Sequence, residues 1–269
     1  MTVPDFLIVG AMKAGTTTLH RDLGMHPDIF LPAQKEPETL VRFDDLVQCE
    51  RDYGELFALS AAGMIRGEAS TAYTKRPVHE GVAEKARDLT GGLLRIVYIR
   101  RDPVARIVSH YRHSNQQGRM PEPLSEALRT YPDLIAFSRY DWQIEPWKRM
   151  FGPDRVLEIE LETYSANRME TVRRVVSHIG ADPERLPLLD DKLVANSAKE
   201  MKHIENGLLN SLVRSKFYQR RVKPVVPSRL REASRRAILP PPPDVDVTLS
   251  AADLEFIAQQ LAADEIEAH

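Results

Sequence analysis

The stretch DFLIVGAMKAGTTTLHRDL, residues 5–23, decides the fold class. It opens with FLIVG at positions 6–10, which has the length and apolar composition of a buried strand. After a turn, Thr16, Thr17 and Thr18 follow a glycine, and hydroxyl side chains in this place favour the start of a helix. Backbone N–H groups at a helix start are free, and with the helix dipole they favour bound phosphate. The stretch therefore predicts a strand, an anion-binding loop and a helix.

The lysine of this loop stands in an unusual place. Loops that bind nucleoside triphosphates read GxxxxGK[ST], with the lysine directly after the second glycine and a hydroxyl residue for magnesium. Here Thr16 follows Gly15, and Lys13 comes two residues before that glycine. Because Lys13 would reach the anion from within the loop, the pattern indicates a leaving group other than that of a kinase or NTPase.

The composition is that of a folded globular protein. The chain has 269 residues, of which 42% are hydrophobic and 28% charged. A net charge of −2 argues against a protein that coats nucleic acid, and no apolar run reaches membrane-spanning length. The N-terminus lacks a signal-peptide pattern and Cys49 is the single cysteine, so we expect a cytoplasmic protein. The eight histidines form no metal-binding motif, and no catalytic metal is expected.

Strands and helices alternate along most of the chain. Further strands are predicted at 64–68, 94–100 and 155–161, and helices at 17–25, 77–89, 103–115, 138–150 and 163–179. Pro146 is expected to kink or end the fourth of these helices. The alternation predicts one α/β domain over residues 1–269, P-loop-like, with a central parallel sheet flanked by helices on both faces.

The part of the chain after about residue 190 reads differently. Between residues 192 and 236 there are twelve Lys or Arg against three acidic residues, which suits an anionic ligand or a solvated basic surface. PPPP at 240–243 predicts an extended connector. We therefore expect a basic, less regular segment at 192–243 and a last helix at 250–263.

A second motif, IRRDPVARIVSHY, occupies residues 99–111. Asp102 can cap a helix, and Pro103 stands at the first helical position, where proline is favoured. The motif places four apolar side chains on one helix face, which we expect to pack on the sheet: Val104, Ile107, Val108 and Tyr111. Arg101 follows the strand, at the edge where α/β sheets bind ligands, and Ser109 lies outside the apolar stripe.

Arg101 and Ser109 together offer a bidentate guanidinium and a hydroxyl, a suitable pair for a terminal phosphate. Arg106 lies between them in the same predicted helix. We expect Arg106 to be an ordinary exposed or ion-paired helix arginine.

Five segments in this order carry a resemblance to a known family: LIVGAMKAGTTTL, LGMHPDI, KEPETL, GEASTAY and IRRDPVARIVSHY. Together they cover nearly the first half of the chain. They resemble the sulfotransferases that use 3′-phosphoadenosine 5′-phosphosulfate (PAPS), in particular the heparan-sulfate-type and bacterial branch, whose loop reads KxGTT. The resemblance implies an enzyme that moves a sulfuryl group from PAPS to a hydroxyl or amine, releases 3′-phosphoadenosine 5′-phosphate (PAP) and needs no metal.

The same resemblance implies which residues bind the nucleotide. The 5′ end would be held by the loop residues Lys13, Ala14, Gly15, Thr16, Thr17 and Thr18, and the 3′-phosphate by Arg101 and Ser109. Lys199 stands in LVANSAKEMK, which resembles a loop that closes over the nucleotide in relatives. A simple helix cap at Asn196 or Ser197 is the alternative for that segment.

Sulfuryl transfer needs charge stabilisation, which Lys13 and the loop amides can supply, and a base for the acceptor. The resemblance implies Glu36 as the base, because it matches the glutamate of a KExHFF-like segment. The family's histidine and aromatic pair are replaced here by Glu38, Thr39 and Leu40, which makes Glu38 a second candidate.

Two other side chains, Glu68 and His110, lie near the predicted site. Glu68 is a third candidate, with a structural carboxylate at a strand end as the alternative. His110 follows Ser109, but neighbours on a helix point about 100° apart, so the two form no nucleophilic pair.

Three readings of the function follow. The first is a PAPS-dependent sulfotransferase acting on a small-molecule, glycan or glycolipid acceptor, with no nucleic acid or membrane span involved. The others are a P-loop kinase or NTPase, and a non-catalytic nucleotide-binding module. The sequence leaves the acceptor open.

Overall fold

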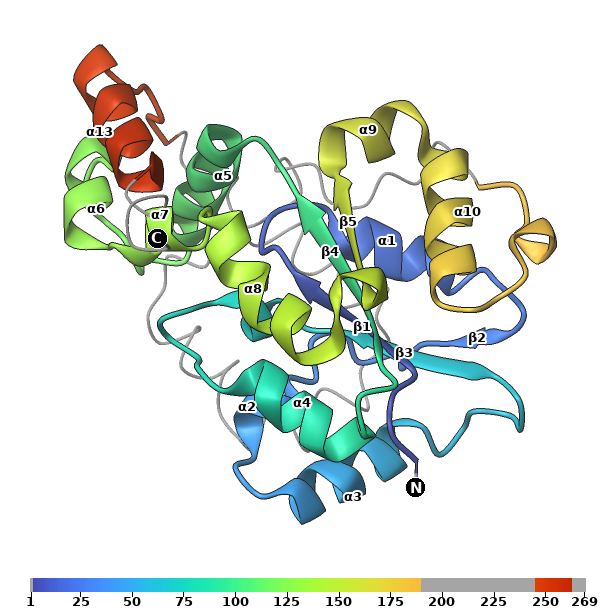
Figure 1. Cartoon of the computed structure of the whole chain (residues 1–269). Helices are drawn as coiled ribbons and strands as arrows, with labels where there is room; N and C mark the ends of the chain where they lie inside the picture. The colour runs from blue at the N-terminus through green and yellow to red at the C-terminus, as the bar shows by residue number, and fades with distance from the viewer. Residues whose placement is uncertain (1, 190–244, 263–269) are drawn as a thin grey trace, which may run out of the picture.

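The computed structural model describes residues 2–189 and 245–262 (Figure 1). Its strands are β1 (Phe6–Gly10), β2 (Ile29–Phe30), β3 (Ile65–Ala69), β4 (Arg95–Arg100) and β5 (Val156–Glu160). Every pairing in the described sheet is parallel, and the order across it is β2-β3-β1-β4-β5. The predicted α/β class with a central parallel sheet is confirmed. Because the chain leaves β1 for strands on both sides, the loops after β1 and β4 meet at the carboxyl edge, where such sheets bind ligands.

Helices cover both faces of the sheet. They are α1 (Thr16–Leu23), α2 (Thr39–Arg42), α3 (Leu46–Leu56), α4 (Val82–Thr90), α5 (Pro103–Gln116), α6 (Leu124–Thr130), α7 (Asp133–Ala136), α8 (Tyr140–Phe151), α9 (Leu161–Ala166), α10 (Arg168–His178) and α13 (Ala251–Ala262). On one face α1 packs against α10, and on the other α4 packs against α8 (Figure 1). Short 3-10 turns lie at η1 (Thr71–Thr74), η2 (Pro153–Arg155) and η3 (Pro183–Arg185).

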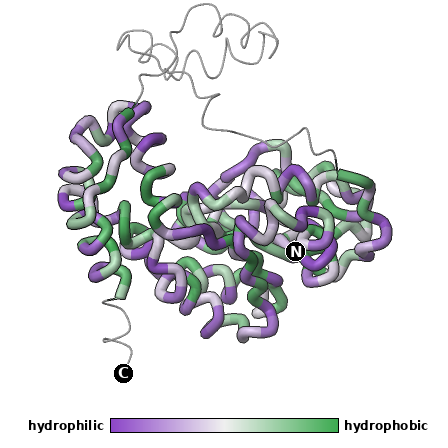
Figure 2. The backbone as a smooth tube through the Cα atoms, turned by 90° about the horizontal axis from the view of Figure 1, so that it is seen from above, coloured by the Kyte–Doolittle hydropathy of each residue, from purple (hydrophilic) through white to green (hydrophobic). Residues whose placement is uncertain are grey.

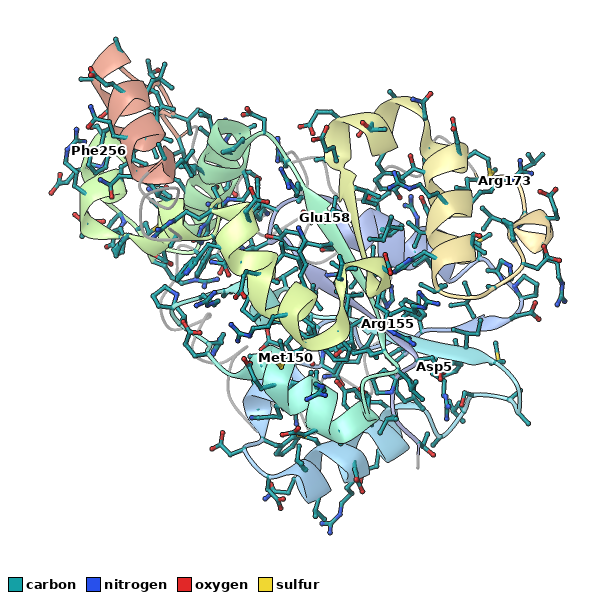
Figure 3. All side chains as sticks on the ribbon, viewed as in Figure 1. Asp5, Met150, Arg155, Glu158, Arg173 and Phe256 are labelled. Atoms are coloured by element: carbon teal, nitrogen blue, oxygen red, sulfur yellow. The ribbon has the colours of Figure 1, made fainter. Side chains whose placement is uncertain are left out.

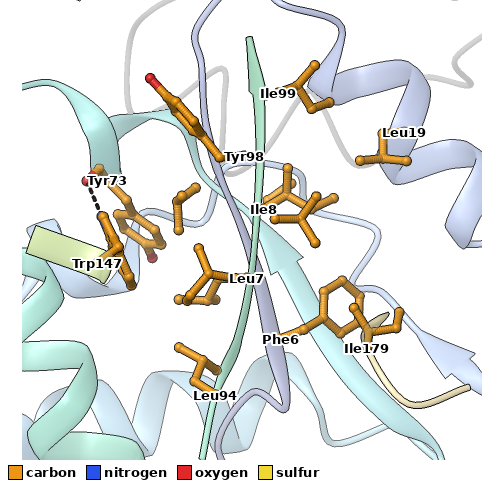
Figure 4. Packing of buried hydrophobic residues seen from close by; sticks show 14 of the residues in the cluster. Phe6, Leu7, Ile8, Leu19, Tyr73, Leu94, Tyr98, Ile99, Trp147 and Ile179 are labelled. Atoms are coloured by element: carbon orange, nitrogen blue, oxygen red, sulfur yellow. Dashed lines mark hydrogen bonds between the residues drawn. The ribbon is translucent and has the colours of Figure 1, made fainter. Parts of the chain in front are cut away.

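The main core lies on both sides of β1. All five residues of this strand are buried, as a central strand between two helical layers requires. Phe6 and Ile8 point to the side of Leu19, while Leu7 points to the side of Tyr73 and Trp147 (Figure 4). The Trp147 indole donates a hydrogen bond to the carbonyl of Tyr73, 3.3 Å away, which satisfies its buried N–H.

The far end of α1 is fixed by a buried charge pair. The carboxylate of Asp22 accepts two hydrogen bonds from Arg168 of α10, one from Nε at 2.8 Å and one from Nη2 at 2.7 Å. It accepts a third from the Tyr164 hydroxyl at 2.5 Å. A bidentate pair fixes geometry as well as contributing energy. The N-terminus of α1, at the opposite end of this short helix, is thereby held in place below the loop after β1.

A second, smaller core lies at one side of the molecule and does not involve the sheet. It joins α5 to α6, α7 and α13 through residues such as Ile107, Tyr111, Leu128 and Ile257 (Figures 1 and 2). The prediction that the apolar stripe of α5 packs on the sheet is therefore wrong. The four residues of the stripe do lie on one face of α5, but that face packs on this helical group: Val104 and Val108 contact it as Ile107 and Tyr111 do.

The last helix is tied to this group by charge as well as by apolar contacts. Asp253 of α13 accepts a bond from Arg129 at 3.0 Å, and the Arg129 guanidinium lies 4.9 Å from the centre of the Phe256 ring (Figure 3). Ser250 and Asp253 cap the helix reciprocally. The helix predicted at 250–263 is thus confirmed over Ala251–Ala262.

Other predicted elements differ in detail from the structure. The helix predicted at 163–179 is two helices, α9 and α10, separated at Asn167. The one predicted at 77–89 begins only at Val82, after Gly81 in the left-handed conformation. Pro146 does not end α8, which continues to Phe151. The predicted basic segment 192–243 lies outside the described residues.

Candidate active site

The loop between β1 and α1 has the conformation of an anion cradle. Lys13 has φ 68° and Gly15 has φ 92°, both in the left-handed region. The amides of Lys13, Gly15, Thr16 and Thr17 donate to no other described residue. Consecutive free N–H groups at the start of a helix attract an anion. Gly15 rather than a threonine is the N-cap of α1, and no side chain caps the helix, so the predicted threonine cap is wrong.

Gly10 ends β1 where the chain has no room for a side chain. A Cβ atom there would lie 2.1 Å from Thr74 Oγ1 and 3.0 Å from Tyr98. Thr74 Oγ1 instead donates to the carbonyl of Val9 at 2.7 Å. This close approach brings the end of β3 and η1 directly beside the phosphate loop.

The structure brings Arg101 to the loop. Arg101 Nη1 donates to the carbonyl of Lys13 at 3.1 Å, although the two residues are 88 positions apart. Burial and, next, the charge of Arg101 lower the pKa of Lys13, whereas the carboxylate of Glu36 raises it. Lys13, Arg101 and Glu36 therefore act on one another at one point of the carboxyl edge.

The remaining predicted nucleotide residues lie around this point. Ala14 and Thr16 are buried in the loop, while Thr17 and Thr18 are partly exposed on the first turn of α1. Ser109 is partly exposed on α5, two turns after Arg101, and its hydroxyl has no hydrogen-bond partner among the described residues. Lys199 falls outside the part of the chain that the structure describes.

The surroundings of Arg106 differ from the prediction. Its side chain is fully buried rather than exposed, and it forms no ion pair with a described residue. Nε donates to Ser138 Oγ and Nη2 to the carbonyl of Leu134. The prediction failed because Leu134 of α7 and Ser138, before α8, pack on this position, and local sequence patterns do not show that packing.

Glu36 and Glu38 lie on a strained loop beside the cradle. Both have φ 56°, a left-handed conformation that is uncommon for residues with a side chain and that marks functional sites. The Glu36 amide donates to the carbonyl of Ala69 at 3.0 Å, and the Glu38 amide to Ser70 Oγ at 3.0 Å. The end of β3 thus fixes the loop that carries both candidate bases.

The two candidates differ in their surroundings. Glu36 accepts a hydrogen bond from Lys35 at 2.6 Å and remains 37% exposed, and its charge acts on Lys13. The charge of Glu38 acts on Lys75, as that of Glu36 also does, and on His79. Both line a cavity of about 470 Å³. Of the two, Glu36 faces the phosphate loop.

Glu68, the third candidate, is enclosed. It is fully buried and accepts bonds from Ser70 Oγ at 2.7 Å and the Tyr53 hydroxyl at 3.2 Å. Burial raises the pKa of Glu68 to about 7. Ser70 Oγ also accepts a hydrogen bond from the backbone amide of Glu38, so Glu68 supports the loop from within the core. Its carboxylate has no exposed surface that an acceptor could reach.

Two residues that sequence reasoning did not select also lie here. Lys75 follows η1, and no hydrogen bond or ion pair joins its ammonium group to a described residue; burial lowers its pKa, while Glu36 and Glu38 oppose the shift. His113 lies one turn beyond Ser109, and burial, then Lys13, lower its pKa to about 4. The only signals in the sequence are the lysine two residues after GEASTAY and a histidine at helical spacing from Ser109.

The site thus brings unpaired loop amides, the cations Lys13 and Arg101 and the carboxylate of Glu36 to the carboxyl edge of the sheet. Within residues 2–189 and 245–262, no three metal-ligating side chains converge, and no helix has the length and apolar character to cross a membrane. A separate cavity of about 860 Å³ lies at the opposite, amino edge, lined by Asp5, Met64 and Leu94 among others, far from the phosphate loop.

A phosphate cradle after the first strand of a parallel sheet, with this strand order, defines the P-loop-like class of α/β proteins. Residues 3–221 match the sulfotransferase domain family. The chain belongs to this family, and it spans about half the length of the curated relative that it matches.

Similar proteins agree with this assignment. The chain is 23% identical over 266 residues to human carbohydrate sulfotransferase 15, a match that covers 73% of this chain and 47% of that protein's length. A solved sulfotransferase from Alicyclobacillus acidocaldarius is 25% identical, with a TM-score of 0.61, over 72% of this chain and 89% of that one. Mouse sulfotransferase SULT7A1 complexed with PAP shares the fold, with 16% identity and a TM-score of 0.52 over 97% of this chain and 83% of that one.

Proposed function

We propose that this sulfotransferase takes its sulfuryl group from PAPS and transfers it to a hydroxyl or amine of a small-molecule, glycan or glycolipid acceptor. The observation that carries the proposal is the contact between Arg101 and the carbonyl of Lys13. The contact holds Arg101, just before α5, against the loop that we assign to the 5′ phosphosulfate, and Ser109 on the same helix is our candidate for the 3′-phosphate. The family member solved with PAP supports the same donor.

The loop geometry disfavours the rival reading as a kinase or NTPase. That chemistry needs a lysine after Gly15 and a carboxylate free to hold magnesium near the phosphates. Thr16 occupies the lysine position, and Glu68 at the end of β3 is engaged by Ser70 and Tyr53 inside the core.

The residues divide the chemistry between them. The loop amides and the ammonium group of Lys13 neutralise charge on the transferred group and on the phosphate that leaves. Glu36 accepts the proton that the acceptor oxygen or nitrogen loses as its bond to sulfur forms. The protein also holds the acceptor in line with the sulfuryl group, and this direct transfer requires no covalent intermediate on the protein.

The name of the human relative supports a carbohydrate-containing acceptor, although the chain matches only 47% of that protein. Incubating the protein with sulfur-labelled PAPS and a cell extract, and identifying the labelled product, would define the acceptor.

Thermal unfolding with nucleotides tests the donor. PAP should stabilise the protein more than ATP with magnesium does at the same concentration, since only PAP can occupy both the cradle and the 3′ site. A ligand at 100 times its Kd contributes about 2.7 kcal/mol of stability. A larger shift in Tm with ATP and magnesium than with PAP would overturn the donor assignment and favour the kinase reading.

A further inference from the structure

Arg106 is a buried cation without a counter-ion among the described residues. Its relative exposure is 0%, and its two hydrogen bonds go to neutral groups, Ser138 Oγ and the carbonyl of Leu134. Its third nitrogen, Nη1, has no partner among the described residues. Burial lowers the pKa of Arg106 to about 10, so the group remains charged at neutral pH. A buried charge left in this state is costly and calls for an explanation.

The groups around Arg106 do not neutralise it. Tyr98 is fully buried, its hydroxyl has no hydrogen-bond partner in the described part of the chain, and burial raises its pKa, which keeps it uncharged. His110, one turn further along α5, is buried with Nδ1 unpaired, and its pKa is lowered to about 3 by burial and then by Arg106. The carboxylate of Asp133 acts on Arg106 from a distance, and the two form no ion pair.

The position of this charge relates it to the nucleotide site. Arg106 lies on α5 between Arg101 and Ser109, and the charges of Arg106 and Arg101 act on each other. A charge enclosed by protein is screened less by water and salt than an exposed one, so it acts over a longer distance. The positive charge of Arg106 would therefore stabilise an anion bound between Arg101 and Ser109 without direct contact.

We propose that Arg106 is a specificity-determining residue whose buried positive charge makes the site prefer nucleotides that carry a 3′-phosphate. The inference rests on the proposed function, because it takes Arg101 and Ser109 as the direct ligands of that phosphate. The phosphate supplies a counter-charge that none of the described residues gives to Arg106 through an ion pair. The hydrogen bonds to Leu134 and Ser138 hold the guanidinium against the connection from α7 to α8 and fix its place behind α5.

The test compares two ligands that differ only in the 3′-phosphate: PAP and adenosine 5′-phosphate (AMP). Calorimetry gives Kd for each with the wild type, Arg106→Gln and Arg106→Lys. Arg106→Gln should weaken PAP binding about tenfold and change AMP binding less than about twofold. Arg106→Lys should keep the preference for PAP within about threefold of the wild type, because it keeps the charge.

Arg129→Gln is the matched control. Arg129 also supports the helical group of α6 and α13, but its side chain is half exposed and is paired with the carboxylate of Asp253, so its loss should leave the PAP-to-AMP affinity ratio unchanged. Equal weakening of PAP and AMP by Arg106→Gln would reduce Arg106 to a structural role and overturn the inference. If Arg106→Gln does not fold, Arg106→Lys provides the test. A tenfold fall in its PAP-to-AMP affinity ratio, despite the retained charge, would also overturn the inference.

The outcomes separate this inference from the proposed function. A wild-type protein that binds PAP no better than AMP contradicts the PAPS assignment itself. A wild-type preference for PAP that survives in Arg106→Gln contradicts only the role given to Arg106.

Discussion

Replacing Glu36 with glutamine should lower kcat by about 10²–10⁴-fold while PAP binding stays within about twofold of the wild type. Glutamine keeps the shape of the side chain but cannot accept the acceptor's proton. The nucleotide contacts lie on the loop after β1 and on α5, so they do not depend on this carboxylate. Steady-state turnover with PAPS and calorimetry with PAP measure the two effects separately.

Glu38→Gln is the control for this variant, since Glu38 shares the left-handed conformation and the same loop. Its charge acts on Lys75 and His79 rather than on Lys13, so we expect kcat to fall less than about fivefold. A large loss in Glu38→Gln with Glu36→Gln active would transfer the base to Glu38. Full activity in both would favour a non-catalytic nucleotide-binding module or a base elsewhere.

Glu68→Gln should change how stability depends on pH. The folded-state pKa of Glu68 is raised to about 7 from an ordinary 4.5, so the unfolded chain loses this proton first as pH rises. The stability contributed by the protonated group is complete below about pH 4.5 and is lost progressively up to about pH 7. A difference of this size corresponds to about 3 kcal/mol. Glutamine stays neutral, so Glu68→Gln should gain that amount relative to the wild type between pH 4.5 and pH 8.

Urea unfolding of both proteins at pH 4.5 and pH 8 measures the change. Glu55→Gln serves as the control, because Glu55 is exposed on α3 and its replacement should leave the pH dependence of the wild type intact. An unchanged free-energy difference between Glu68→Gln and the wild type at the two pH values would show that folding does not raise the pKa of Glu68, and would contradict the prediction.

The sequence predicts the parts of this fold that local chemistry controls. β1 is predicted without error, because four apolar residues between a charged residue and a glycine permit little else. α5 begins where predicted because Asp102 caps it, accepting the amide of Ala105 at 2.7 Å, and Pro103 stands at its first position. β2 has only two residues and gives no periodic signal, so it was not predicted.

What could not be predicted depends on which surfaces meet. The apolar stripe of α5 indicates a buried face but not the partner, and the partner is the group of α6, α7 and α13 instead of the sheet. The burial of Arg106 also depends on residues distant in sequence, since Leu134 and Ser138 accept its hydrogen bonds. Lys75 likewise becomes a neighbour of Glu36 only because η1 packs against β1. The roles given to Lys13, Glu36, Arg101 and Ser109 remain predictions that the experiments above address.

A crystal structure of the protein with bound PAP tests the central claim most directly. The 5′-phosphate should accept hydrogen bonds from the amides of Gly15, Thr16 and Thr17 at about 3 Å, and the 3′-phosphate should contact Arg101 and Ser109. A nucleotide bound elsewhere, for example in the cavity at the amino edge of the sheet, with the loop after β1 empty, would contradict the account.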